Sequence, residues 1–218
     1  MPDILVLTAH PQLEHSRINR ALMHAAQQLP ATQVEVRDLY ALYPDYLIDV
    51  AAEQRALAAA RLLVWQHPLH WYGMPPLMKL WLDEVFAFGW AYGPGGLALS
   101  GKDLWLVTST GGNASAYHPS GHNRHFIDAF WPPYEQAAAL AGLRFLPPLV
   151  LHGAHRVPQA EVDAHAALFA ERLGCYPDWP ELDLLPPCID CEVPQDARPA
   201  EDEPAPGPAA RSEAGAPA

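Results

Sequence analysis

The chain has 218 residues, half of them hydrophobic, which is enough to bury the core of one ordinary domain and excludes a wholly disordered protein. Its formal charge is −12 at pH 7, from 25 acidic and 13 basic residues, and this argues against nucleic acid as a partner. The three cysteines all lie at or after position 175, which argues against a secreted domain built on disulfides. We expect no signal peptide and no membrane-spanning segment, and therefore a cytoplasmic protein.

The negative charge and the proline are concentrated near the carboxyl end of the sequence. Residues 178–218 carry a net charge of −8, whereas residues 1–177 carry only −4, and ten of the 24 prolines lie at 177–218. Because such a composition cannot bury a core, we expect a globular domain at 1–176 and a disordered tail, rich in Pro, Ala and acids, at 177–218. Cys188 and Cys191 in this tail have C-x-x-C spacing, but they lack a βαβ context and are interpreted as exposed thiols.

The predicted domain alternates strand patterns with helix patterns. A nearly all-apolar run at 3–8 predicts a strand buried on both faces, and a helix with apolar residues at helical spacing begins near Ser16. Further strands are predicted at 34–36, 61–65, 104–108 and within 144–152, and further helices at 51–60, 77–86, 134–141 and 158–173. This alternation predicts an α/β fold with a doubly wound, five-stranded parallel sheet of order 2-1-3-4-5. Ligands of such sheets bind at the carboxyl ends of strands 1, 3 and 4.

Polar residues connect the first predicted strand to its helix. A helix N-terminus offers unpaired backbone N–H groups and the positive end of the helix dipole, both of which favour an anionic phosphate. Ser16 and Asn19 add neutral donors there, while His10 and Arg17 can add positive charge. Taken in isolation, this segment is better explained as an ordinary capped helix with surface histidines, because caps of this kind are common. Neither of the glycine-rich nucleotide motifs, G-x-x-x-x-G-K-[ST] and G-x-G-x-x-G, occurs in the chain.

The loops after the third and fourth predicted strands contain further candidate binding residues. The loop 66–76 combines prolines with His70, Trp71 and Tyr72, which together make a rigid wall suited to a planar ring. The loop 108–112 combines hydroxyl groups with two glycines, which let the backbone approach a ligand closely. Aromatic packing on the next helix and a simple glycine turn are the alternatives. Because these loops follow strands 3 and 4, they are expected at the same edge of the sheet as His10.

Five segments, taken in order along residues 3–175, resemble one known family. They are His10-Pro11 with Ser16-Arg17-Ile18-Asn19, Pro68-Leu69-His70-Trp71-Tyr72, Lys79-Leu80-Trp81-Leu82-Asp83, Gly89-Trp90-Ala91-Tyr92-Gly93, and Gly111-Gly112 with Tyr117. They look like the flavodoxin-like NAD(P)H quinone reductases, and most like the ancillary quinone reductases of bacterial glutathione-regulated potassium-efflux systems. The resemblance implies a flavodoxin-like fold, NAD(P)H dehydrogenase (quinone) activity, and a homodimer whose two subunits form each pocket. The tail has no counterpart in this pattern.

The resemblance also implies roles for individual residues. Tyr117, and His122 with a similar role, would stabilise charge during reduction, and the segment 89–96 with Trp90 and Tyr92 would lie over a pocket. The phosphate end of the flavin would be held by the residues near the first helix, the ring by the loop after the third strand, and its pyrimidine side by the loop after the fourth. The flavin-binding residues expected are His10, Ser16, Arg17, Ile18, Asn19, Pro68, Leu69, His70, Trp71, Ser109, Thr110, Gly111 and Gly112.

The resemblance favours FMN as the flavin, with FAD as the alternative. NADH or NADPH would donate a hydride in a two-electron ping-pong cycle, and a quinone would accept it. One alternative function is a regulatory flavoprotein that activates a potassium-efflux antiporter by binding at the inner face of the membrane. Another is a one-electron carrier, which the aromatic loop at 70–72 disfavours. We expect no metal, because His118, His122 and His125 have no cysteine nearby and only Asp128 as a carboxylate.

Overall fold

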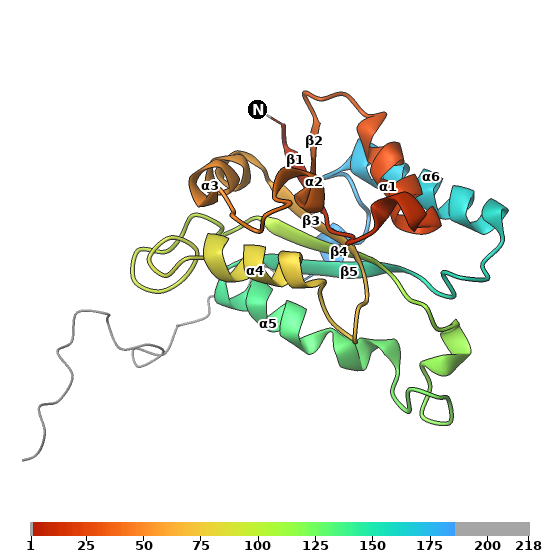
Figure 1. Ribbon diagram of the computed structural model, residues 1–218. Coiled ribbons are helices and arrows are strands. Elements are labelled where there is room, and N and C mark those ends of the chain that lie inside the picture. The colour runs from red at the N-terminus through yellow and green to blue at the C-terminus, as the bar shows by residue number, and fades with distance from the viewer. Residues whose placement is uncertain (1, 186–218) are drawn as a thin grey trace, which may run out of the picture.

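The computed structural model describes residues 2–185, which form a five-stranded parallel sheet with helices on both faces (Figure 1). The strands are β1 (Ile4–Thr8), β2 (Val34–Asp38), β3 (Leu62–Pro68), β4 (Asp103–Ser109) and β5 (Arg144–Leu151). All four neighbouring pairs are parallel, and the strand order is β2-β1-β3-β4-β5. The fold class and the strand order predicted from the sequence are therefore confirmed. Within the described residues, no helix is both long enough and apolar enough to cross a membrane.

The helices form a layer on each side of the sheet. Helices α1 (Arg17–Gln27) and α6 (Gln159–Cys175) pack on one face. The other face is covered by α2 (Leu39–Leu42), α3 (Val50–Ala59), α4 (Pro76–Val85) and α5 (Pro132–Leu140). In the described chain, three short 3-10 helices lie between these elements, at Leu13–His15, Ala114–Ala116 and Ile127–Phe130, and a fourth follows α6 at Leu182–Leu184. Side chains alternate along each strand, so that Leu63 and Trp65 of β3 face one layer while Leu62 and Val64 face the other. Burial on both faces explains the continuous apolar runs within β1, β3 and β4.

The predicted elements agree with the structure apart from their ends and one short helix. Strand β3 continues to Pro68 and β4 to Ser109, and α6 passes through Gly174 to Cys175. The sequence did not predict α2, because four residues are too few to show helical periodicity. A local cap begins this helix: the Asp38 side chain accepts hydrogen bonds from the N–H groups of Tyr40 and Ala41.

The folded chain extends beyond position 176, where the sequence places the start of a disordered tail. Trp179 is only 3% exposed, and its ring packs edge-on against Trp105 with the ring centres 4.8 Å apart. Its indole Nε1–H donates to the carbonyl of Arg172 at 2.7 Å. Residues 177–185 therefore extend the domain, because Trp179 and Leu182 are buried in the core on the α6 side of the sheet despite the surrounding prolines and acids. The rest of the predicted tail, including Cys188 and Cys191, lies outside the described residues.

We expect Trp179→Ala to lower the free energy of unfolding by about 3 kcal/mol, because it would leave a cavity between α6 and β4. Leu184→Ala is the matched control in the same segment, since Leu184 is 85% exposed, and it should change stability by less than about 0.5 kcal/mol. Urea unfolding followed by circular dichroism measures both values. Equal, small effects of the two substitutions would show that residues 177–185 do not contribute to the folded domain.

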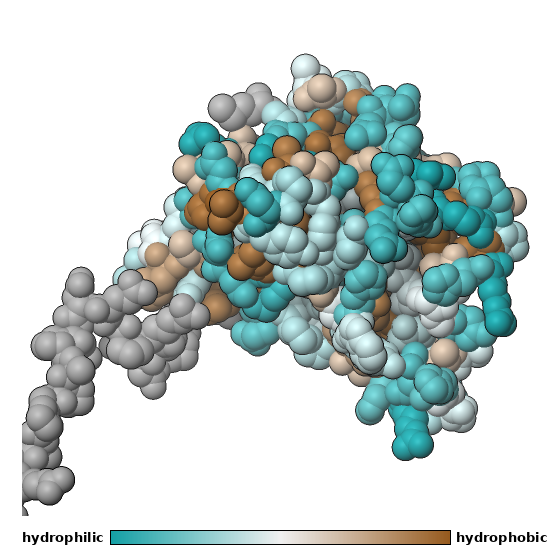
Figure 2. Space-filling model, viewed as in Figure 1, coloured by the Kyte–Doolittle hydropathy of each residue, from teal (hydrophilic) through white to brown (hydrophobic). Residues whose placement is uncertain are grey.

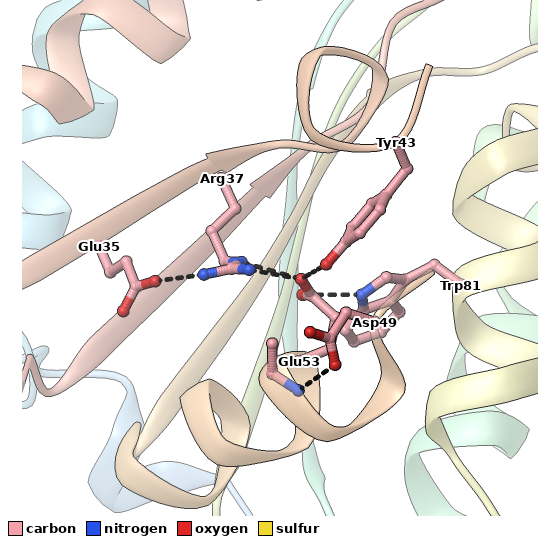
Figure 3. A network of polar contacts seen from close by, with 7 residues as sticks. Glu35, Arg37, Tyr43, Asp49, Glu53 and Trp81 are labelled. Carbon is pink, nitrogen blue, oxygen red and sulfur yellow. Dashed lines mark hydrogen bonds and ion pairs between the residues drawn. The ribbon is translucent and has the colours of Figure 1, made fainter. Parts of the chain in front are cut away.

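A buried carboxylate joins β2, α3 and α4 (Figure 3). Glu53 of α3 has a fully buried side chain and accepts hydrogen bonds from the Arg37 guanidinium at 2.6 Å and from Trp81 Nε1 at 2.9 Å. The hydroxyl of Tyr43 donates to the same carboxylate, and Arg37 also pairs with Glu35. Burial alone would lower the pKa of Arg37, but the hydrogen bonds to Glu53 and Glu35 raise it above its ordinary value. The Arg37 guanidinium therefore stays charged, and both oxygens of the Glu53 side chain have hydrogen-bond partners.

Glu53→Gln should cost about 3 kcal/mol of unfolding free energy, because the amide removes the countercharge of Arg37 and cannot accept all of the hydrogen bonds at this position. The exposed i,i+4 pair of Lys79 and Asp83 on α4 supplies the control. Asp83→Asn should cost less than about 0.5 kcal/mol. Chemical denaturation of both variants at pH 7 makes the comparison. A Glu53→Gln variant as stable as Asp83→Asn would contradict the structural role of the buried pair.

Candidate functional site

A cavity of about 690 Å³ opens at the carboxyl ends of β1, β3 and β4. This is the edge of the sheet at which the strand order places a ligand. Four segments form its wall: the turn after β1 with the start of α1, the loop after β3, the end of β4 with its following glycine, and the loop after β5. The lining residues are His10, Gln12, His15, Ser16, Arg17, Ile18, Asn19, Pro68, Leu69, His70, Trp71, Ser109, Gly111, Ala154 and His155.

Eleven of the thirteen residues expected to bind a flavin line this cavity; Thr110 and Gly112 do not. Sequence reasoning did not select four of the lining residues, namely Gln12, His15, Ala154 and His155. The first two lie between selected residues. Ala154 and His155 follow β5, and β5 adjoins β4 in the predicted strand order. The end of β5 was therefore a signal that could have identified them.

The N-terminus of α1 forms the polar end of the cavity. Ser16 caps the helix, its Oγ accepting from the N–H of Asn19 at 3.2 Å. The N–H groups of Arg17 and Ile18 in the first turn have no backbone acceptor within the helix, so they remain available to an anion. The Arg17 guanidinium donates to the carbonyl of Val157 and to Oε1 of Gln159, each at 3.1 Å. These contacts hold one positive charge at the rim of the cavity.

A buried hydrogen-bond network lies beneath the cavity. Asn19 Nδ2 donates to Oγ of Ser16 at 3.1 Å and to Oγ of Ser109 at 3.0 Å. Gln66 Nε2 donates to the backbone carbonyl of Asn19 at 2.9 Å. The Thr8 hydroxyl in turn donates to Gln66 Oε1 at 2.8 Å. Because these bonds join β1, β3 and β4 to α1, they fix the floor of the cavity relative to the helix N-terminus.

The loop after β3 presents aromatic side chains at the rim. Reciprocal backbone hydrogen bonds between His70 and Gly73 close a tight turn, with Trp71 and Tyr72 at its tip. Both tip residues have left-handed backbones, with φ of 48° and 65°, a conformation that is strained for bulky side chains. Tyr72 stacks on Phe130 with ring centres 5.1 Å apart, whereas Trp71 is 96% exposed. The turn therefore holds Trp71 outward beside the cavity.

Two neutral histidines face each other in the cavity wall. The rings of His10 and His70 lie edge to face, with their centres 5.9 Å apart. Burial lowers the pKa of both, and the neighbouring His70 lowers the pKa of His10 further. His10 Nδ1 accepts from the N–H of Gln12 at 3.0 Å, so in the neutral ring the proton is on Nε2. His10 can therefore donate a hydrogen bond to a ligand without carrying a charge.

The two predicted catalytic residues do not line the cavity. Tyr117 is 9% exposed and lies behind the cavity wall: a side-chain carbon built on Gly112 would be 3.5 Å from the Tyr117 ring. Burial raises the pKa of Tyr117, so its hydroxyl keeps its proton at neutral pH. His122 is exposed and makes no hydrogen bond or ring contact to the described part of the chain. The side chain of Thr110 is buried and bonds to the carbonyl of Gly112 rather than facing the cavity.

His67 of β3 is fully buried beneath the loop that carries Pro68. Its ring stacks on Tyr134 with centres 5.8 Å apart, and its Nδ1 bonds to the carbonyl of Pro68 at 2.9 Å. Since a carbonyl can only accept, Nδ1 carries the proton, and Nε2 has no partner among residues 2–185. Burial lowers the pKa of His67 to about 4. In the folded protein the His67 ring therefore stays neutral at pH values at which an exposed histidine would be protonated.

The pKa of His67 predicts loss of stability in acid. Between pH 6.5 and about 4 the unfolded chain takes up a proton at this residue that the folded chain does not. The free energy of unfolding should therefore fall by about 3 kcal/mol as the pH falls through this window. His67→Phe should remove that part of the pH dependence, while His24→Asn, at an exposed position of α1, should keep it. Urea unfolding at several pH values tests this, and parallel curves for the wild type and His67→Phe would contradict it.

Comparisons with known proteins agree with the fold and the family expected from the sequence. The family described as having a flavodoxin-like fold matches residues 2–173. The glutathione-regulated potassium-efflux system ancillary protein KefF of Citrobacter koseri is 45% identical over 170 residues, which cover 78% of this chain and 94% of that protein. General stress protein 14 of Treponema denticola, solved in complex with FMN, is 35% identical with a TM-score of 0.75, and the match covers 79% of this chain and 98% of that one. An NADPH-quinone reductase from P. pentosaceus is 25% identical with a TM-score of 0.68, and the match covers 78% and 96% of the two chains.

Proposed function

Since the chain belongs to the family with the flavodoxin-like fold, we propose that it is a flavin-dependent NAD(P)H:quinone oxidoreductase. The observation that carries this proposal is a cavity at the carboxyl edge of the sheet in which the unpaired N–H groups of a helix N-terminus and an aromatic rim meet. The FMN in the Treponema denticola neighbour and the activity named for the P. pentosaceus neighbour support it. A cytoplasmic location accords with the proposal, because NADH and NADPH are found there.

The residues of the cavity fit a flavin. The N–H groups of Arg17 and Ile18, together with the Ser16 hydroxyl, would hold its phosphate. The loop from Pro68 to Trp71 would line the ring system on one side, and Gly111 leaves room for the ring to approach the backbone closely. FMN is preferred to FAD because the Treponema denticola neighbour contains FMN. The choice between NADH and NADPH is left to measurement.

When bound, the flavin would supply the chemistry, accepting a hydride from NADH or NADPH and passing it to a quinone. The protein's own residues would bind and orient the flavin and the substrates, and they would exclude water. Leu69 and Trp71 would provide an apolar wall, and the Nε2–H of the neutral His10 ring would donate a hydrogen bond to the ligand. The Tyr117 hydroxyl keeps its proton and can stabilise negative charge that develops during reduction. Because one cavity serves both substrates, they would bind in turn, which is the ping-pong order.

A homodimer is part of this proposal. Large hydrophobic side chains are exposed on the loops of the described chain, namely Trp71, Tyr72, Phe88, Leu97 and Phe126. In Figure 2, hydrophobic residues reach the surface in separate patches among hydrophilic ones. Trp90 and Tyr92 pack against this chain's own core and are not part of its cavity wall. Since no residue of the segment 89–96 lines the cavity of its own chain, in the proposed homodimer this segment would lie over the pocket of the second copy.

The identity to KefF favours a second, compatible role. In this role the protein would dock on a potassium-efflux antiporter at the inner face of the membrane and regulate it. Tyr117→Phe separates the two roles, because it removes the hydroxyl behind the cavity and leaves the surface unchanged. Lost quinone reduction with retained activation of potassium efflux would assign regulation to binding alone. Loss of both together would make turnover part of the regulation.

The proposed activity predicts a bound flavin that is reduced and reoxidised. Purified protein reconstituted with FMN should show a flavin absorption spectrum that bleaches anaerobically with NADH or NADPH and returns when a quinone is added. Bound flavin that neither nucleotide bleaches would contradict the reductase and favour a carrier or a regulator. Failure to bind either FMN or FAD would overturn the proposed cofactor as well.

The phosphate end can be tested with two arginines of α1. Arg17→Gln should weaken FMN binding about tenfold, because it removes a positive charge at the cavity rim. Arg20→Gln is the matched control, since Arg20 bonds to the carbonyl of Glu14 and does not line the cavity. Fluorescence titration with FMN measures both affinities. Equal affinities of the two variants would contradict the placement of the phosphate at this helix end.

A further inference from the structure

We propose that His152, a residue which the sequence did not single out, positions Tyr117 through a hydrogen bond to Thr110, and that the exposed His122 does not share this role. The proposal rests on the proposed function, because the part played by Tyr117 comes from there. It assigns a function to the side chains of His152 and Thr110, neither of which lines the cavity.

His152 lies directly against Tyr117. It is the first residue after β5, it is half-buried, and its ring centre is 5.3 Å from that of Tyr117 at an angle of 41°. Phe130 packs edge-on against the Tyr117 ring at 5.9 Å. The tyrosine ring is therefore in contact with an imidazole and a phenyl ring, which together restrict its direction. His122 makes no comparable contact to the described chain.

The hydrogen bonds at Thr110 fix which nitrogen of His152 carries the proton. The Thr110 hydroxyl lies 2.7 Å from the carbonyl of Gly112 and 2.9 Å from Nδ1 of His152. A carbonyl oxygen can only accept, so the single hydroxyl proton points to Gly112. Nδ1 of His152 must then be the donor to Thr110. The His152 imidazole thus donates to the Thr110 hydroxyl, which in turn donates to the carbonyl of Gly112. The ring of Tyr117 lies next to this glycine.

Backbone hydrogen bonds hold the segment 151–154 against the loop 110–112. The N–H of Thr110 donates to the carbonyl of Leu151 at 3.0 Å, and the N–H of Ala154 donates to the carbonyl of Thr110 at 2.9 Å. The N–H of Gly153 donates to the carbonyl of Gly112 at 2.9 Å. The carbonyl of Gly112 thus accepts from both the Thr110 hydroxyl and Gly153. This double attachment makes the Gly112 backbone a fixed support.

The backbone of Gly111 and Gly112 connects Tyr117 to the cavity. Gly112 is the direct neighbour of the Tyr117 ring, and the adjacent Gly111 lines the cavity. A small rotation of the loop would therefore move the tyrosine hydroxyl relative to any ring bound on the other side of the wall. Since His152 does not line the cavity, its loss should affect turnover and leave flavin binding intact. It is a positioning residue.

The amide of asparagine can test this role, because its Nδ2 occupies the place of Nδ1 in histidine. His152→Leu should lower kcat about tenfold with little change in the FMN dissociation constant. His152→Asn should restore most of the lost kcat, since it can still donate to Thr110. Thr110→Val should resemble His152→Leu, and the double variant should be no worse than either single one. His24→Leu, at an exposed position of α1, is the control for an unchanged kcat.

A second measurement does not depend on turnover or on flavin. In nitrogen NMR spectra of the flavin-free wild type, the His152 ring should show the Nδ1–H tautomer, with its signals assigned by their loss in His152→Asn. The Thr110→Val variant should lose the preference for that tautomer.

The outcomes separate the two proposals. A wild type without quinone reductase activity would overturn the proposed function, while the tautomer would still test the contact between His152 and Thr110. An active wild type whose kcat survives His152→Leu, or a His152→Asn variant no better than leucine, would overturn the positioning role. A parallel loss of FMN affinity in these variants would also overturn it, because it would assign His152 to the cavity wall.

Discussion

The site depends on the buried side chain of Asn19. This amide bonds to Ser16 and Ser109, while Gln66 reaches its backbone carbonyl from β3 and is itself bonded to Thr8 of β1. Three strands and one helix are thus held in one relative position by groups that are all satisfied. A buried polar network of this kind tolerates little rearrangement, because each displaced group would be left without a partner. The geometry of the cavity is fixed before any ligand arrives.

A second polar cluster stabilises the opposite layer without touching the cavity. Glu53 draws Arg37, Tyr43 and Trp81 together from three elements on the α3 and α4 side of the sheet. The two networks differ in kind, since one is made of neutral amides and hydroxyls and the other contains an ion pair. The neutral network lies at the floor of the cavity. The ion pair lies where only the packing of helices is at stake, so charge is kept away from the floor of the cavity.

Much of the fold could be predicted from the sequence because parallel strands buried on both faces are apolar without interruption, as β1 and β4 show. The strand order then placed His10, the loop after Gln66 and the loop after Thr108 at one edge, and the cavity lies there. What the sequence could not supply was the direction of side chains. Thr110 stands among cavity residues yet its hydroxyl points away, and the packing of Trp179 depends on a surface that no local pattern describes. His152 had no signal of its own, because its neighbours are 35 and 42 positions away.

The turn with Trp71 and Tyr72 at its tip is not the one that stability alone would favour. Both residues adopt a backbone conformation that glycine would adopt without strain, and the Trp71 side chain gains almost nothing from burial within its own chain. A sequence optimised for stability alone would place glycine at such a tip. Tyr72 stacks on Phe130 of its own chain, whereas Trp71 is almost fully exposed and has no aromatic partner in the described chain. The strained tip of the loop thus carries one aromatic side chain that packs within the chain and one that is open to solvent beside the cavity.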